Sequence, residues 1–164
     1  MSKASHFKVK GFSAPIRALS LSKIPNCTFK CKCNRIIAEL PIRYENDNYK
    51  YKLKIKIDSS GYYKCYIISP QISFENGIPP HIYLFDSKLD EENKVFKELR
   101  LCLHLPGCGE YSVASPIMET IVSWAIKWTE FYELWLLTGV WYGGGKHITD
   151  DLEKAKLSEE LRNK

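Results

Sequence analysis

The stretch Tyr49–Ile57 reads YKYKLKIKI, in which aromatic or apolar side chains alternate strictly with lysines. Successive side chains of a β-strand point to opposite faces, so the pattern predicts a strand that is buried on one face and solvated on the other. The preceding stretch Arg35–Tyr44 has the same period, and residues 45–48 between the two have the composition of a turn. The two stretches are therefore predicted to pair as antiparallel neighbours.

The predicted sheet continues on the C-terminal side. A turn at Asp58–Gly61 leads into a third strand at Tyr62–Ile68, and a fourth is expected at His81–Phe85. Strands joined by such short turns form an antiparallel meander. Residues 1–34 lack a clear period and are expected to form an irregular N-terminal segment, acting as a docking arm or as the first helix of the fold. Residues 35–164 are expected to form the single domain.

After the predicted sheet, the apolar period changes to that of a helix. Apolar residues recur every three or four positions at Ile117, Ile121, Trp124, Trp128, Phe131 and Trp135. We expect Ser115 to cap this helix, Pro116 to open it and Gly139 to end it. The tryptophans on this face are interpreted as core, and a last polar helix is expected after Thr149. The predicted fold class is α+β, with helices packed on a four-stranded meander.

Composition excludes several classes of protein. The chain has 164 residues, enough for one domain, and a formal net charge of +5 that by itself indicates neither a nucleic-acid nor a membrane partner. The lysines of Tyr49–Ile57 lie on the face opposite the tyrosines, which favours a solvated sheet face over an RNA-binding one. The first ten residues lack an apolar signal region, and charged residues interrupt the most apolar window, 117–142. We expect a soluble, cytoplasmic protein with reduced thiols.

Two motifs suggest ligands but fit poorly. Cys27, Cys31 and Cys33 are spaced as C-x3-C-x-C, without the second pair that a structural zinc site needs. Residues 143–146 read GGGK, but they lack the earlier glycine and the following hydroxyl residue of a phosphate-binding loop. We expect neither a metal nor a cofactor.

The heptapeptide Leu101–Gly107, LCLHLPG, is the strongest candidate for chemistry. If it is extended, its leucines, the last of them Leu105, face the core, and Cys102 and His104 point together to the other side. A thiol held beside a potential base is a plausible nucleophile. The alternative is that Cys102 is simply a small buried apolar residue.

The order of motifs resembles the stand-alone ubiquitin-conjugating-like proteins of bacterial type II (short) CBASS anti-phage systems, over roughly residues 35–147. The segments that carry this resemblance are Pro80-His81-Ile82-Tyr83, Leu101-Cys102-Leu103, Thr120–Trp124, Tyr132–Trp135, Thr138–Trp141 and Gly143–Gly145. The resemblance implies a ubiquitin-conjugating-enzyme-like fold.

The resemblance also implies thioester chemistry on Cys102, which would take up an acyl group and pass it to an amine. The implied partner is the cGAS-like (CD-NTase) nucleotidyltransferase of the same operon, whose C-terminus would be processed or conjugated. His81 and His104 are the candidate catalytic partners, and Tyr83 is a further candidate for orientation or proton transfer. Lys94 stands eight residues before the cysteine, where the eukaryotic family has the asparagine that supports the oxyanion, so the oxyanion-stabilising group stays open.

Two alternatives to acyl transfer remain. The chain could be a cysteine hydrolase or deconjugating enzyme that uses Cys102 with His104 or His81. It could also be a non-catalytic scaffold of the same fold that binds the nucleotidyltransferase.

Overall fold

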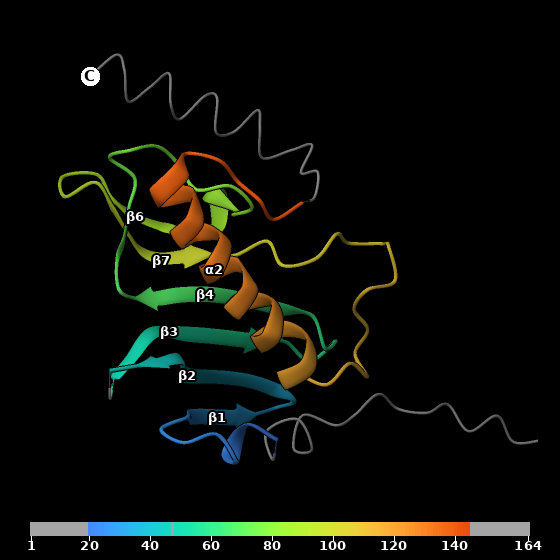
Figure 1. Ribbon diagram of the computed structural model, residues 1–164. Coiled ribbons are helices and arrows are strands. Elements are labelled where there is room, and N and C mark those ends of the chain that lie inside the picture. Colours follow the sequence, from blue (N-terminus) through green and yellow to red (C-terminus); the bar gives the residue numbers. More distant parts are fainter. Residues whose placement is uncertain (1–19, 47, 145–164) are drawn as a thin grey trace, which may run out of the picture.

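The computed structural model describes residues 20–46 and 48–144, which build an antiparallel sheet covered on one face by a long helix (Figure 1). In these ranges seven strands pair in the order β1-β2-β3-β4-β7-β5, and β6 also pairs with β7. The strands are β1 (Thr28–Lys32), β2 (Arg35–Glu45), β3 (Asn48–Ile57), β4 (Tyr63–Ser69), β5 (Ile72–Ser73), β6 (Lys88–Asp90) and β7 (Val95–Arg100). The helical segments with complete bounds are η1 (Leu84–Asp86), η2 (Met118–Val122) and α2 (Ser123–Thr138), and residues 20–22 are also helical. The predicted α+β class is confirmed, but the sheet is larger than four strands.

The alternation of β3 is confirmed in the packing. Leu53, Ile55 and Ile57 lie in the core, where Ile55 is opposite Ala38 of β2. The lysines point to the other face, where Lys52 forms an ion pair with Glu39 at 3.0 Å. The predicted solvated face is therefore correct, and cross-strand charge pairs cover it.

Residues 1–34 were expected to be irregular, and this prediction is wrong for Thr28–Lys32, which form strand β1. β1 pairs with β2 along its whole length, from Thr28 opposite Glu39 to Lys32 opposite Arg35. The two turn residues between the strands both have a left-handed backbone, with φ of 50° at Cys33 and 58° at Asn34, as a type I′ hairpin requires. All five residues of β1 are exposed, so no apolar period marks this strand.

The fourth predicted strand, His81–Phe85, is also corrected. This segment makes a single bridge, between Ile82 and Leu101, and then turns into η1. The strand beside β4 is β7, which lies in the segment between His81 and Cys102 that carries many charged residues. The Ser87 hydroxyl accepts from the Arg100 amide at 2.9 Å, which is a side-chain contact in place of a ladder bond.

Helix α2 packs its inner face on the sheet, which it crosses in Figure 1. Its buried residues are Ala125, Trp128, Thr129 and Tyr132. The helical segment begins at Met118 in a π-helical turn rather than at Pro116, and Ile117 rather than Ser115 occupies the cap position. The Ser115 hydroxyl accepts from the Ser112 amide in the preceding turn. Gly139 ends the helix as predicted, with φ of 72°.

The last helix, expected after Thr149, lies outside the described residues. Among the helices of residues 20–46 and 48–144, none is long and apolar enough to cross a membrane.

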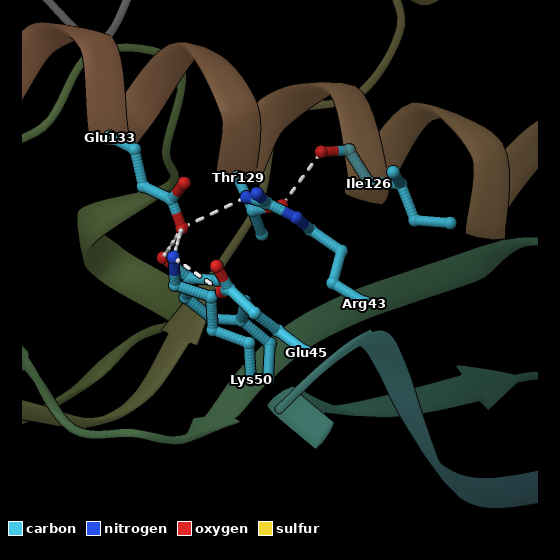
Figure 2. Close-up of polar contacts among 7 residues, drawn as sticks. Arg43, Glu45, Lys50, Ile126, Thr129 and Glu133 are labelled. Atoms are coloured by element: carbon cyan, nitrogen blue, oxygen red, sulfur yellow. Dashed lines mark hydrogen bonds and ion pairs between the residues drawn. The ribbon is translucent and has the colours of Figure 1, made fainter. Parts of the chain in front are cut away.

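A carboxylate on α2 ties the helix to the adjacent strands (Figure 2). Glu133 accepts from the Tyr51 hydroxyl at 2.8 Å and forms ion pairs with Arg43 at 2.9 Å and Lys50 at 3.0 Å. Arg43 has φ of 56°, and this left-handed backbone breaks the strand alternation in β2, which would otherwise aim its side chain away from the helix. The same guanidinium lies 3.4 Å from the Thr129 hydroxyl, which in turn donates to the Ile126 carbonyl.

Replacing Glu133 tests this anchor. Partial burial acts to raise the pKa of Glu133, but the hydrogen bonds from Tyr51, Lys50 and Arg43 outweigh it and hold the pKa below its ordinary value. We expect Glu133→Ala to lower the free energy of unfolding by about 1–3 kcal/mol at pH 7, measured by urea denaturation.

The pH dependence of this loss follows from the sign of the shift. A carboxyl group with a lowered pKa in the fold stabilises above its unfolded pKa, so the difference between wild type and Glu133→Ala should shrink below about pH 4. Glu130→Ala, at an exposed position on the same helix, is the control and should change stability by less than about 0.5 kcal/mol. Equal effects of the two substitutions would contradict the anchor.

Candidate functional site

Cys102 lies one residue beyond the bridge that closes the sheet next to β7. The Leu101 amide donates to the Cys65 carbonyl of β4 at 2.9 Å, and the Cys102 amide donates to the His81 carbonyl at 2.9 Å. Backbone on both sides therefore fixes this segment, and the position of the thiol follows from the sheet rather than from a loop.

The segment Pro80–His81 is held in turn by α2. The indole N–H of Trp128 lies 3.2 Å from both the Pro80 and the His81 carbonyl oxygens. His81 has φ of 55°, a left-handed backbone that is uncommon outside glycine and asparagine. The His81 carbonyl thus receives two donors, one from the helix and one from Cys102.

A cavity of about 430 Å³ opens between this segment, α2 and the residues that follow it. Its lining residues are His81, Cys102, Leu103, His104, Leu105, Glu110, Trp124, Lys127, Trp128, Phe131, Trp141, Gly143 and Gly144. The structure therefore brings together the three residues that the sequence singled out, Cys102, His81 and His104. Tyr83 is not among the lining residues and packs instead against the Arg100 guanidinium, 4.3 Å from the ring centre.

Cys102 is 8% exposed, and its thiol lies 3.9 Å from the His104 carbonyl oxygen, which can accept a weak S–H hydrogen bond. Cys65 behind it is fully buried, and burial raises the pKa of the Cys65 thiol. Cys31, Cys33 and Cys108 are exposed. Among the cysteines of the described ranges, Cys102 is the one that lines the cavity.

His104 is enclosed by aromatic rings. Its Nδ1 atom lies 2.7 Å from the Tyr63 hydroxyl oxygen, and its ring stacks on Trp124 at a centroid distance of 5.8 Å. Burial lowers the pKa of His104, although the nearby Glu110 acts to raise it, and the net shift favours the neutral imidazole. The prediction that Leu105 faces the core is wrong, since it is 47% exposed where the chain turns toward Gly107.

The wall of the cavity after α2 is formed by Trp141 and the glycines. The Trp141 ring lies 5.5 Å from the His81 ring, and its indole N–H donates to the Gly143 carbonyl. Gly143 is buried against Phe131: a Cβ atom at this position would lie 2.5 Å from the Phe131 ring. A side chain at Gly144 would meet no atom within 4 Å.

Sequence reasoning missed several parts of this wall. Trp124 was interpreted as core but lines the cavity, because the buried face of α2 is centred on Ala125 and Thr129 instead. Phe131 and Lys127 lie on the same flank of the helix as Trp124, at the helical spacing that the sequence contains. Glu110 and Tyr63 carried no recognisable signal. Glu110 comes near His104 through the local turn in which it accepts from the Leu105 amide, and Tyr63 reaches His104 through long-range folding.

No arrangement of three or more histidine, cysteine or acidic side chains suited to a metal ion occurs among residues 20–46 and 48–144. Cys31 lies in β1 and Cys33 in the hairpin turn that follows it. Gly145 and Lys146 of the GGGK motif lie outside the described residues.

The packing of Gly143 generates a prediction with a matched control. Gly143→Ala should force Phe131 to move and lower the free energy of unfolding by about 1–3 kcal/mol, because overpacking a close contact is destabilising. Gly144→Ala, one residue away in open space, should leave it nearly unchanged. Thermal unfolding of both variants makes the comparison, and equal melting temperatures would contradict the described wall.

Comparison with known proteins was made against curated proteins and against protein-family models. The search of curated proteins found no significant match. The family described as "Type II CBASS E2 protein" matches residues 17–148, a range that includes every strand of the sheet, α2 and the cavity lining. Because this match spans far more than half of the sequence, the chain belongs to the type II CBASS E2 protein family.

Proposed function

We propose that this protein is a ubiquitin-conjugating-like acyltransferase that acts in the cytoplasm in anti-phage defence, with Cys102 as its nucleophile. Membership of the type II CBASS E2 family supports a defence role and conjugating activity in general. The observation that carries the finer proposal is the position of Cys102. Its amide is fixed by the His81 carbonyl, and its thiol faces a cavity lined by two histidines.

The proposed reaction has two steps. The Cys102 thiol gives up its proton and its sulfur attacks a carbonyl carbon in the C-terminal region of a protein. The resulting tetrahedral intermediate collapses to a thioester as either the C–N bond of a peptide or the C–O bond of an activated C-terminus breaks. A leaving amine takes up the proton that the thiol gave up. An amine, such as that of a lysine, then attacks the thioester, loses a proton and releases the Cys102 thiolate.

The proposed acyl donor is the C-terminus of the CD-NTase nucleotidyltransferase encoded in the same operon. A cavity of about 430 Å³ falls in the range of pockets that enclose small ligands, so it suits a chain end rather than a folded surface. Its walls include three tryptophans, one phenylalanine and two histidines, with one charge of each sign supplied by Glu110 and Lys127. Peptide groups can pack flat against such rings while the two charged side chains contact polar groups of the bound chain.

The hydrolase alternative uses the same cavity, because water in place of the amine converts acyl transfer into hydrolysis. The low exposure of Cys102 supports the scaffold alternative, because a cysteine that serves only as a small buried apolar residue would also be poorly exposed. The three readings differ in what becomes of the nucleotidyltransferase C-terminus.

Co-expression with the neighbouring nucleotidyltransferase distinguishes them. Wild type should form an adduct that is destroyed by thiols, and Cys102→Ser should abolish it or retain it as a more stable ester, as seen on reducing and non-reducing gels. Cys102→Ala should give no adduct. Cys108→Ser, which changes an exposed cysteine near the cavity, is the matched control and should behave as wild type.

Each alternative has its own outcome in that experiment. A shortened nucleotidyltransferase without any amine-linked product, identified by mass spectrometry, would replace acyl transfer with hydrolysis. Intact nucleotidyltransferase bound equally by wild type and Cys102→Ala, with phage defence unchanged, would overturn the catalytic proposal in favour of a scaffold.

A further inference from the structure

The feature that the proposed reaction leaves unexplained is the pairing of His104 with Tyr63. The two side chains are 41 residues apart in sequence, and their Nδ1 and hydroxyl oxygen atoms lie 2.7 Å apart. Tyr63 is 5% exposed and belongs to β4, the strand whose Cys65 carbonyl holds Leu101 in place. The same part of the sheet therefore positions both the histidine ring and the cysteine.

The direction of this hydrogen bond follows from the donors available. Burial raises the pKa of Tyr63, so its hydroxyl keeps its proton and must place it on an acceptor. Among the described residues, the partner of the Tyr63 hydroxyl is His104 Nδ1. If the hydroxyl donates to Nδ1, then Nδ1 carries no proton, and a neutral imidazole holds its proton on Nε2.

The surroundings of the ring fix it in this orientation. Trp124 stacks on the ring with an interplanar angle of 24°, and Tyr111 packs at a centroid distance of 5.5 Å. Tyr111 also meets the Tyr63 ring edge to face at 4.7 Å, and its hydroxyl donates to the Gly61 carbonyl. Within the described residues no hydrogen bond joins Nε2 to a protein group, and His104 is one of the residues that line the cavity. An Nε2–H donor would therefore be available to a group bound there.

We infer that His104 stabilises the oxyanion through Nε2–H and that Tyr63 is the positioning residue that sets this tautomer. The inference rests on the proposed function and supplies the oxyanion-stabilising group that the sequence left open. It assigns His104 the role of hydrogen-bond donor rather than that of general base.

The step is balanced without any transfer of the imidazole proton. As the Cys102 sulfur forms its bond to the carbonyl carbon, the C=O π electrons move onto oxygen, and Nε2–H donates a hydrogen bond to that oxygen. When the intermediate collapses, the C=O bond re-forms, the leaving group departs, and the proton remains on Nε2. Deacylation by the amine passes through the same oxyanion and uses the same donor.

The tautomer can be measured independently of activity. Imidazole ¹⁵N NMR of wild type at pH 7, with His104→Gln used to assign the signals, should show a protonated Nε2 and a bare Nδ1 for His104. In Tyr63→Phe, which keeps the ring but removes the hydroxyl, the two tautomers should become mixed. A wild-type spectrum with the proton on Nδ1 would overturn the inference whether or not Cys102 forms an adduct.

Adduct formation with the nucleotidyltransferase supplies the second readout. His104→Ala should slow it by about 100-fold, the usual cost of losing an oxyanion donor. His104→Gln, whose side-chain amide can donate near the Nε2 position, should recover at least about tenfold of that loss. A glutamine variant as slow as alanine would overturn the donor role, because glutamine cannot act as a general base.

Tyr63→Phe should slow adduct formation by about tenfold, while the rate of Cys102 alkylation by a small iodoacetamide stays within twofold of wild type. Unchanged adduct formation in a folded Tyr63→Phe variant would overturn the positioning role. Tyr62 is exposed and directly precedes Tyr63 in the sequence, so Tyr62→Phe is the matched control and should behave as wild type in every assay.

Discussion

The arrangement of the cavity depends on one carbonyl group, that of His81. It accepts from the Cys102 amide and from the Trp128 indole, and so joins the end of the sheet, the Pro80–His81 segment and α2 at a single atom. None of the three parts adjoins another in sequence, and each would have an unsatisfied polar group if the others moved. The left-handed backbone of His81, φ 55°, is the local cost of presenting the carbonyl in that direction.

Helix α2 has two tasks that are separated along its length and around its axis. At its C-terminal half Glu133 binds three side chains from β2 and β3, and this polar anchor sets how the helix crosses the sheet (Figure 2). On the adjacent flank Trp124 and Phe131 face the cavity rather than the sheet. A shift of the helix along its axis would therefore change the cavity, which links the stability of the anchor to the shape of the site.

Periodicity predicted the parts of the fold in which one face is buried. The lysine alternation of β3 gave its two faces correctly, and Gly139 marked the end of α2 because a left-handed residue is needed there. β1 was missed because all its residues are exposed, and pairing with β2 rather than burial defines it. The heptapeptide predicted that Cys102 and His104 share a side, and both line the cavity. Tyr63 could not be predicted as a partner of His104, since nothing local to either residue encodes a contact across 41 positions.

The low exposure of Cys102 has a consequence for damage by oxidants. Thiols are oxidised according to their thiolate character and their accessibility. Cys31, Cys33 and Cys108 are exposed, whereas an oxidant reaches Cys102 by entering the cavity that it lines. A dilute peroxide is therefore expected to reach the three exposed cysteines before it reaches Cys102.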